Sequence, residues 1–174
     1  SPAVFDMVKL RWMNGEYIRK MTPEQFHEAA SPYYSEALKE KGIDLVKLSR
    51  LLQPRTEVFS DIPAMTGFLE SLPDYDISLY EHKKMKTDAA ISLKALKAAL
   101  PVLEKAEPWE NDVLYGALTA LAAEMGMKNS QILWPVRTAL SGKAATPGGA
   151  TELAELLGKE ETIARIRKGV EKLG

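Results

Sequence analysis

Apolar residues recur at helical spacing along almost the whole of this chain, and that pattern restricts it to helical folds. The longest periodic stretch is DAAISLKALKAALPVLEKA, residues 88–106, where the residues three or four apart are Leu93, Leu96, Leu100 and Leu103. Apolar residues at this interval form one face of an amphipathic helix. Pro101 lies inside the stretch and is predicted to kink or divide the helix. DISLY, residues 76–80, is the only short candidate for a strand, so the sequence predicts an all-α protein.

Start and stop signals divide this pattern into separate helices. Thr22, Pro23 and Gln25 combine a capping hydroxyl, a first-turn proline and a capping-box partner. Asp44 is predicted to cap a leucine-rich helix. Glycines follow several helical segments, as expected at helix ends, at positions Gly42, Gly126, Gly142 and Gly158. A turn-rich break near residues 74–87 predicts two packed helical subdomains, residues 1–83 and residues 84–174.

The residue types present limit the chemistry that the chain can carry. It has no cysteine, and neither histidine, His27 or His82, has a second histidine at ligand spacing. No phosphate-binding loop or dinucleotide fingerprint occurs, so we expect no catalytic residue, no bound metal and no cofactor in this sequence. No apolar run is long enough for a membrane span and no signal peptide pattern is present, so we expect a cytoplasmic protein without membrane contact. The net charge is −1, but residues 128–174 carry 8 basic and 5 acidic side chains.

The stretch WPVRTALSGKAATPGG, residues 134–149, combines a helix with an unusual loop. Trp134 and Arg137 are three residues apart and so share one helix face, and the loop that follows offers exposed backbone N–H groups together with Lys143 and Thr146. An unstacked base can stack on tryptophan and be read along its edge by arginine. In the alternative interpretation Trp134 is a core residue, Arg137 a surface residue and the loop a plain connector. Spacing alone favours this alternative.

Two further stretches each allow two interpretations. Large apolar residues crowd FDMVKLRWMNGEYIR, residues 5–19, and we expect them to pack onto the domain, onto a partner upstream, or both. Simple core packing is the better of these from composition alone. The basic segment KKMKT, residues 83–87, is either a solvated helix start or a contact with a phosphate backbone.

Together these stretches resemble the C-terminal part of bacterial glutamyl-tRNA synthetases. The first looks like the motif FDxxKLxWMNxxYI of that family, and residues 132–166 look like its ending, with the elements R-x-A-L-x-G, T/S-P-G and L-G-K-E. The resemblance implies a parent protein that joins glutamate to tRNA with ATP and magnesium in a catalytic module. The present sequence lacks that module, so as this fragment it is not an enzyme and holds no cofactor. The resemblance implies a stem-contact portion followed by an α-helical anticodon-binding cage.

The resemblance also implies which residues contact tRNA. By position, Trp134, Arg137, Thr146 and Pro147 would lie against the anticodon bases, although small residues stand at 148–150 where the family often has a bulky apolar one. Arg55 matches a position of the family that helps to read the third anticodon base. The resemblance implies that family members with arginine at this position charge only glutamate tRNA. Contacts with the tRNA backbone are expected from the lysines of two loops, which are Lys84, Lys86 and Lys143.

The expected partners are glutamate tRNA and the catalytic module. Glutamine tRNA is a further partner if recognition of the third anticodon base is not strict. We expect a monomer. An alternative function is a helical protein–protein interaction domain. That alternative fits the near-neutral charge and the many amphipathic helices equally well. The joint presence of the two terminal motifs favours tRNA recognition.

Overall fold

The computed structural model describes the backbone of residues 2–174 and the side chains of residues 6–174. Within this part of the chain the fold is all-α, as predicted, and the extended pairing is confined to one isolated bridge between His82 and Thr87. The chain forms two compact units, Ser1–Glu70 and Ser71–Gly174. This division falls before residue 71, earlier than the boundary after residue 83 that the sequence suggests.

The N-terminal unit is built from short helices joined by 3₁₀ turns. Its α-helices are α1 (Pro2–Lys20), α2 (Pro23–Ala30), α3 (Glu36–Glu40), α4 (Leu45–Leu52) and α5 (Ile62–Glu70), and its 3₁₀ turns are η1 (Ser31–Tyr33), η2 (Gln53–Arg55) and η3 (Phe59–Asp61). The predicted caps are present, because Thr22 and Gln25 form a capping box and Asp44 accepts from the Lys47 N–H. The unit is small, and its core centres on Phe26, Leu38, Leu48, Leu52, Ile62 and Phe68.

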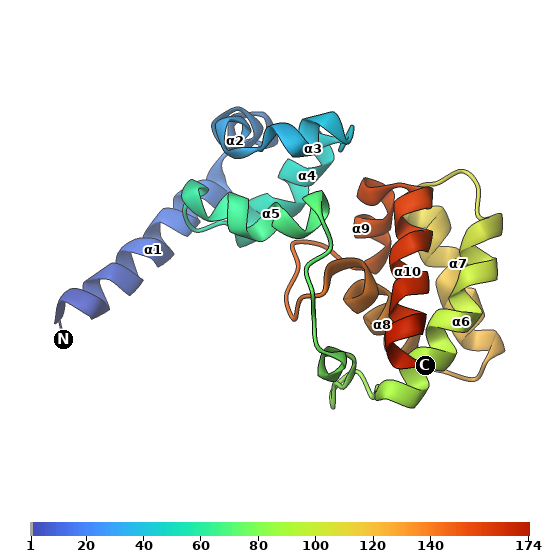
Figure 1. Cartoon of the computed structure of the whole chain (residues 1–174). Coiled ribbons are helices and arrows are strands. Elements are labelled where there is room, and N and C mark those ends of the chain that lie inside the picture. The colour runs from blue at the N-terminus through green and yellow to red at the C-terminus, as the bar shows by residue number, and fades with distance from the viewer. Residues whose placement is uncertain (1) are drawn as a thin grey trace. The chain divides into compact units, whose positions relative to one another are not determined.

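Helix α1 is attached to this unit mainly by its second half. Gly15 and Ile18 are buried, and the Gln53 side-chain amide donates to the carbonyl oxygens of Ile18, at 3.0 Å, and Met21, at 2.9 Å. Arg11 contributes an ion pair to Asp61 at 2.6 Å. The first half of the helix extends beyond the other helices of the unit (Figure 1).

Most large apolar side chains of α1 are exposed, which differs from the expectation of core packing. The exposed fractions are 58% for Leu10, 61% for Trp12 and 72% for Tyr17, with Met7, Val8 and Met13 also exposed. The face that carries Gly15 and Ile18 is the one that packs, and Leu10, Met13 and Tyr17 point away from it. Met7 and Val8 share that face but lie in the first half of the helix. The Phe5 side chain of the predicted motif lies outside the described residues.

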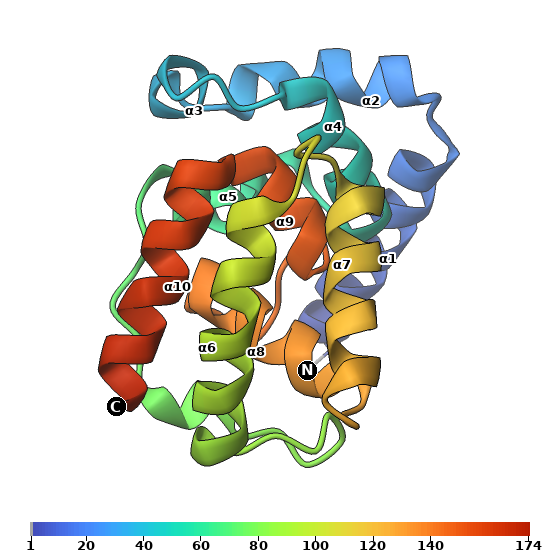
Figure 2. The same cartoon turned by 90° about the vertical axis from the view of Figure 1, so that its right-hand side faces the viewer.

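The C-terminal unit is a bundle of longer helices. It contains η4 (Ile77–Tyr80), α6 (Ala89–Lys105), α7 (Asn111–Glu124), α8 (Asn129–Ser141), α9 (Ala150–Leu157) and α10 (Lys159–Leu173). Helices α10, α6 and α7 lie side by side, with α8 and α9 behind them (Figure 2). The buried leucines of α6, α7 and α8 form the centre of the unit.

Two local predictions in this unit are corrected by the structure. Of the two outcomes predicted for Pro101, a kink or a division, the division does not occur. Helix α6 continues from Ala89 to Lys105, because a single proline removes only one backbone hydrogen bond and its exposed ring lies on the outside of the bundle. The strand candidate at residues 76–80 is the 3₁₀ turn η4, because the Asp76 carboxylate accepts from the Ser78 N–H at 2.8 Å and starts a turn.

Residues 71–83 belong to the C-terminal unit because two tyrosines pack into it. Tyr75 and Tyr80 are buried and share a hydrogen bond of 2.8 Å between their hydroxyl groups. The Tyr80 hydroxyl lies close to Gly169 of α10, and the Lys172 ammonium sits 4.6 Å from the centroid of the Tyr75 ring. These contacts fix η4 to the end of α10 and explain the position of the division.

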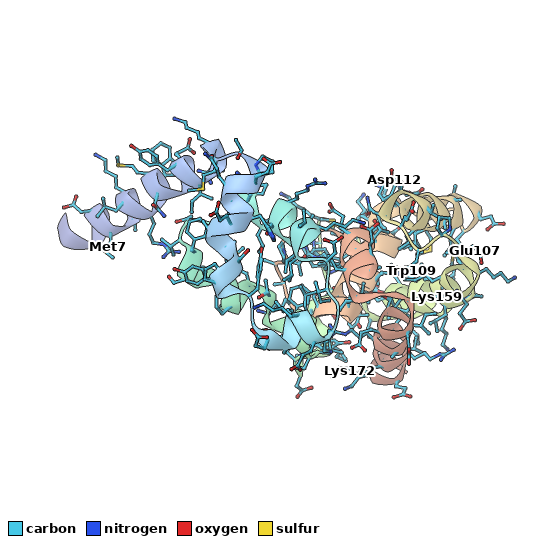
Figure 3. All side chains as sticks on the ribbon, turned by 90° about the horizontal axis from the view of Figure 1, so that it is seen from above. Met7, Glu107, Trp109, Asp112, Lys159 and Lys172 are labelled. Carbon is cyan, nitrogen blue, oxygen red and sulfur yellow. The ribbon has the colours of Figure 1, made fainter. Side chains whose placement is uncertain are left out.

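Side chains also fasten the two inter-helix connections at the other end of the bundle. The Trp109 indole N–H donates to the Ala154 carbonyl at 2.9 Å, and the Lys159 ammonium donates to the Glu104 carbonyl at 2.5 Å. Figure 3 shows Trp109 and Lys159 on this side of the unit. The α6–α7 connection is therefore attached to α9, and the start of α10 is attached to the end of α6.

Candidate nucleic-acid interface

A pocket opens on the surface of the C-terminal unit between the start of α7, the middle of α8 and the start of α9. Its volume is about 590 Å³. It is lined by Met85, Asn111, Asp112, Tyr115, Ser130, Leu133, Trp134, Arg137, Gly149, Ala150, Thr151 and Glu152. The lining combines aromatic and aliphatic surface with a few polar groups, the usual make-up of a ligand site.

Trp134 and Arg137, which the sequence places on one helix face, both line this pocket and contact each other. The Arg137 guanidinium carbon lies 4.4 Å from the centroid of the Trp134 ring, a cation–π geometry. The indole N–H donates to the Leu79 carbonyl at 3.2 Å, and the His82 ring packs on the indole at 4.3 Å between centroids. Both side chains are half-buried, so the pair is held in place and is still open to a ligand.

Pro135 lies in the middle of α8 rather than in its first turn, because the helix begins at Asn129. The Trp134 side chain therefore projects from the body of the helix. The expected stop at Gly142 is present. Gly142 has a φ of 61°, in the left-handed region, and its N–H donates to the Thr138 carbonyl at 2.8 Å.

The loop after α8 folds back on itself. Thr146 and Pro147 are buried, and the Thr146 hydroxyl donates to the Gly148 carbonyl at 2.6 Å. Arg137 supports the loop from the helix, since its guanidinium donates to the Ala144 carbonyl at 2.5 Å. Neither Thr146 nor Pro147 belongs to the pocket lining, so their predicted contact with bases stays a prediction and their visible role is to shape the loop.

Helices α7 and α9 supply the part of the pocket that sequence reasoning missed. Tyr115 is 48% exposed and adds a second aromatic surface to the lining. The Thr151 hydroxyl donates to the Asn111 side-chain oxygen at 2.7 Å, and the Asn111 backbone N–H donates to a Glu155 carboxylate oxygen at 2.6 Å. The sequence offers one signal that could have indicated this surface, which is a single tyrosine, Tyr115, in a helix otherwise rich in alanine and leucine.

The predicted backbone-contacting lysines lie in two loops of the same unit. Lys84 and Lys86 are exposed in the loop that the His82–Thr87 bridge closes, and Met85 between them lines the pocket. Lys143 is half-buried in the loop after α8. Arg55 belongs to the N-terminal unit, where it is exposed at the end of η2 and donates to the Leu51 carbonyl at 3.3 Å.

The described residues contain no cluster of histidine, aspartate or glutamate side chains that could hold a metal ion. None of the described helices is long and apolar enough to cross a membrane.

The aromatic and arginine side chains of the pocket are groups that nucleic-acid-binding modules use to stack and hydrogen-bond bases, and the family comparison identifies such a module. Residues 25–170 match the family model described as "Anticodon binding domain". The chain belongs to this family of anticodon-binding domains.

Comparison with individual proteins narrows the family to one kind of enzyme. The chain is 54% identical over 173 residues to a glutamate–tRNA ligase of Clostridium acetobutylicum, an alignment that covers 99% of this chain and 36% of the relative. A glutamate–tRNA ligase of Clostridium novyi is 51% identical over 176 residues, again covering 36% of the relative. The matched region is the C-terminal part of these enzymes, so the chain spans about a third of their length.

A solved structure shares the fold. The glutamate tRNA ligase from Elizabethkingia meningosepticum superposes with a TM-score of 0.71 at 24% identity, and the match covers 94% of this chain and 32% of that one.

Proposed function

We propose that this chain is the tRNA-recognition part of a glutamate–tRNA ligase, and that the pocket beside Trp134 receives an unstacked anticodon base. The observation that carries the proposal is the Trp134–Arg137 pair at a pocket of about 590 Å³. That volume is within the range of roughly 300–1,000 Å³ typical of small-molecule sites. The relatives named above are glutamate–tRNA ligases, which supports this choice of nucleic acid.

Each side chain of the pocket has a role that follows from its chemistry. The faces of Trp134 and Tyr115 offer stacking surfaces, and stacking on an aromatic side chain contributes about 1–3 kcal/mol per base. Arg137 supplies donors to a base edge or a phosphate. Asn111 and Thr151 offer polar groups along the opposite wall. Thr146 and Pro147 act by holding the loop, which sets where its backbone N–H groups point.

The other parts of the proposed function also rest on the similarity to glutamate–tRNA ligases. The full-length protein would ligate glutamate to tRNA with ATP and magnesium in its catalytic module, and would act as a cytoplasmic monomer. The N-terminal unit would contact the tRNA stem. Arg55 would help to read the third anticodon base, which favours glutamate tRNA over glutamine tRNA.

One observation favours a second function, a helical protein-interaction domain. The exposed Leu10, Trp12 and Tyr17 on α1 are a surface that a protein could cover. Ionic strength separates the two functions, because RNA binding weakens steeply with salt while an apolar protein contact does not. The pocket belongs to the other unit, so both functions could reside in one protein.

The test is a binding titration with glutamate tRNA and with a copy whose anticodon bases are changed, at low and moderate salt. We expect preference for the intact anticodon, lost in Arg137→Ala and kept in Arg167→Ala. Arg167 is the matched control, because it is an exposed arginine of the same unit that pairs with Glu104 outside the pocket. Equal affinity for both tRNAs would overturn the proposal.

A further inference from the structure

Two lysine side chains meet beside the pocket in the C-terminal unit. Lys86 lies in the loop closed by His82 and Thr87, and Lys128 lies at the N-cap of α8. Both are exposed. A hydrogen bond with Lys86 and the repulsion between the two ammonium groups lower the pKa of Lys128. Neighbouring like charges repel each other, and an anion bound between them offsets the repulsion.

The side chains of Gln131 and Ser130 hold the backbone segments of the two lysines together. The side-chain amide of Gln131 donates to the Lys86 carbonyl at 2.9 Å, and its oxygen accepts from the Lys128 N–H at 2.9 Å. Ser130 adds a second tie, since its hydroxyl donates to the Met85 carbonyl at 3.0 Å. Gln131 thus joins the backbones of both lysines, and their proximity is a property of the fold rather than of two flexible side chains.

Three features of this arrangement oppose stability. The like charges repel, and Lys128 sits at a helix N-terminus, where the helix dipole disfavours a cation. Lys86 has a φ of 59°, a left-handed conformation that is uncommon for a residue other than glycine. None of the ion pairs recorded among the described residues includes Lys86 or Lys128, so no carboxylate offsets their charge by direct pairing. An anion would relieve the first two of these costs.

We propose that Lys86 and Lys128 together bind one phosphodiester group of an RNA backbone at the edge of the pocket. Lys86 directly follows Met85, and Lys128 stands two residues before Ser130, and both Met85 and Ser130 line the pocket. A nucleotide whose base enters the pocket therefore carries its phosphate past the lysine pair. A phosphodiester suits the pair because its two free oxygens can each accept a charge-assisted hydrogen bond. The choice of RNA rests on the proposed function.

The test measures how an RNA hairpin with the anticodon stem and loop of glutamate tRNA binds to the full chain. The variants are Lys86→Ala, Lys128→Ala and the double variant, with Lys168→Ala as control. Lys168 is an exposed lysine of α10 in the same unit, so its removal changes the net charge equally. We expect each single variant of the pair to bind about fivefold more weakly at low salt, the loss of one close charge contact, and Lys128→Arg to restore binding.

Salt dependence distinguishes one shared phosphate from two separate contacts. The slope of log K against log salt is negative, and its magnitude should decrease by roughly 0.7 in the double variant, the value for one phosphate on a single strand. The slope should stay unchanged in Lys168→Ala. If Lys86→Ala and Lys128→Ala behave like Lys168→Ala while the native chain binds the hairpin with anticodon preference, the phosphate site is wrong and the proposed function stands.

A second readout does not need RNA binding at all. NMR titration of the lysine side-chain amines should show the pKa of Lys128 rise when inorganic phosphate replaces chloride at equal ionic strength. If the native chain binds no hairpin, the proposed function fails, and this titration still decides whether the lysine pair binds phosphate. A Lys128 pKa that phosphate leaves unchanged would overturn the inference.

Discussion

The guanidinium of Arg137 lies over the indole ring of Trp134, at 4.4 Å from the ring centroid, and donates to the Ala144 carbonyl of the following loop. One side chain therefore connects the aromatic surface of the pocket with the loop beside it. A ligand that stacks on Trp134 meets a positive charge whose position is already fixed. Fixed groups lose less conformational freedom on binding, which strengthens recognition.

Substitutions at Trp134 should separate stacking from packing. Trp134→Leu should weaken binding of glutamate tRNA by about 1–3 kcal/mol, the contribution of base stacking on an aromatic side chain, while Trp134→Phe should keep most of the affinity. Both variants lose the hydrogen bond to the Leu79 carbonyl, so that loss cancels in the comparison. Fluorescence titration against labelled tRNA checks the result, with circular dichroism to confirm folding. Equal losses in the two variants would contradict a stacking role.

Gly142→Ala should destabilise the protein through strain and a collision together. Gly142 has a φ of 61°, and an added Cβ would lie 2.8 Å from Cδ1 of Tyr75. Left-handed strain of about 1–2 kcal/mol and overpacking of about 1–3 kcal/mol predict a loss of about 2–5 kcal/mol. Gly126 is the matched control, because its φ of 66° is similar and nothing lies within 4 Å of its added Cβ.

Gly126→Ala should therefore lose only the strain term, about 1–2 kcal/mol. Urea unfolding followed by far-ultraviolet circular dichroism compares the two variants with the native chain. If both lose the same stability, the Tyr75 ring accommodates the added Cβ without cost, and the predicted overpacking at Gly142 is wrong.

The features that the sequence predicted correctly depend on neighbours along the chain. The cap at Thr22, the cap at Asp44 and the end of α8 at Gly142 each follow from a few consecutive residues. Trp134 and Arg137 share a face because residues three apart on a helix always do. Local rules of this kind require no knowledge of how the helices pack.

The features that the sequence did not predict depend on packing between distant segments. Tyr115 and Thr151 join the pocket only because α7 and α9 lie beside α8. Lys128 was not recognised as a functional candidate, since hydrogen bonds of Gln131 and Ser130 to a distant loop bring it to Lys86. The exposed side chains of α1 have the same cause, because periodicity shows that a helix has an apolar face and not what covers it.

Alkaline pH should weaken the C-terminal unit through its buried tyrosine pair. Burial, and then the hydrogen bond with Tyr75, raise the pKa of Tyr80 far above its ordinary value of 10.0. The unfolded chain therefore loses the Tyr80 proton near its ordinary pKa while the folded chain keeps it. The contribution of Tyr80 is fully present below about pH 10 and is lost as pH rises above it, because the unfolded state then binds fewer protons.

The measurement is the free energy of unfolding at about pH 8 and about pH 11, on either side of the ordinary tyrosine pKa. Tyr80→Phe should show a smaller loss between the two conditions than the native chain. Tyr34 of the N-terminal unit also has a pKa raised by burial, so it contributes equally to both proteins and cancels in the difference. An equal alkaline loss in Tyr80→Phe would exclude Tyr80 as the cause.

Gly169→Ala and Gly116→Ala should change stability in opposite directions although both glycines lie inside helices. An added Cβ at Gly169 would lie 2.6 Å from the Tyr80 hydroxyl oxygen and 3.0 Å from Cδ1 of Leu96, in the packed contact of α10 with η4 and α6. Overpacking of this kind costs about 1–3 kcal/mol, which exceeds the gain of up to about 1 kcal/mol from replacing a helical glycine.

At Gly116 of α7 nothing lies within 4 Å of the added Cβ, so only the gain from helix propensity remains. We expect Gly116→Ala to raise stability by about 0.5–1 kcal/mol and Gly169→Ala to lower it by up to about 2 kcal/mol, the difference between collision and propensity. Urea unfolding of both variants beside the native chain checks the signs. A stabilised Gly169→Ala would mean that the tyrosine pair can shift, and η4 would then be held to α10 less firmly than the contacts of Tyr80 indicate.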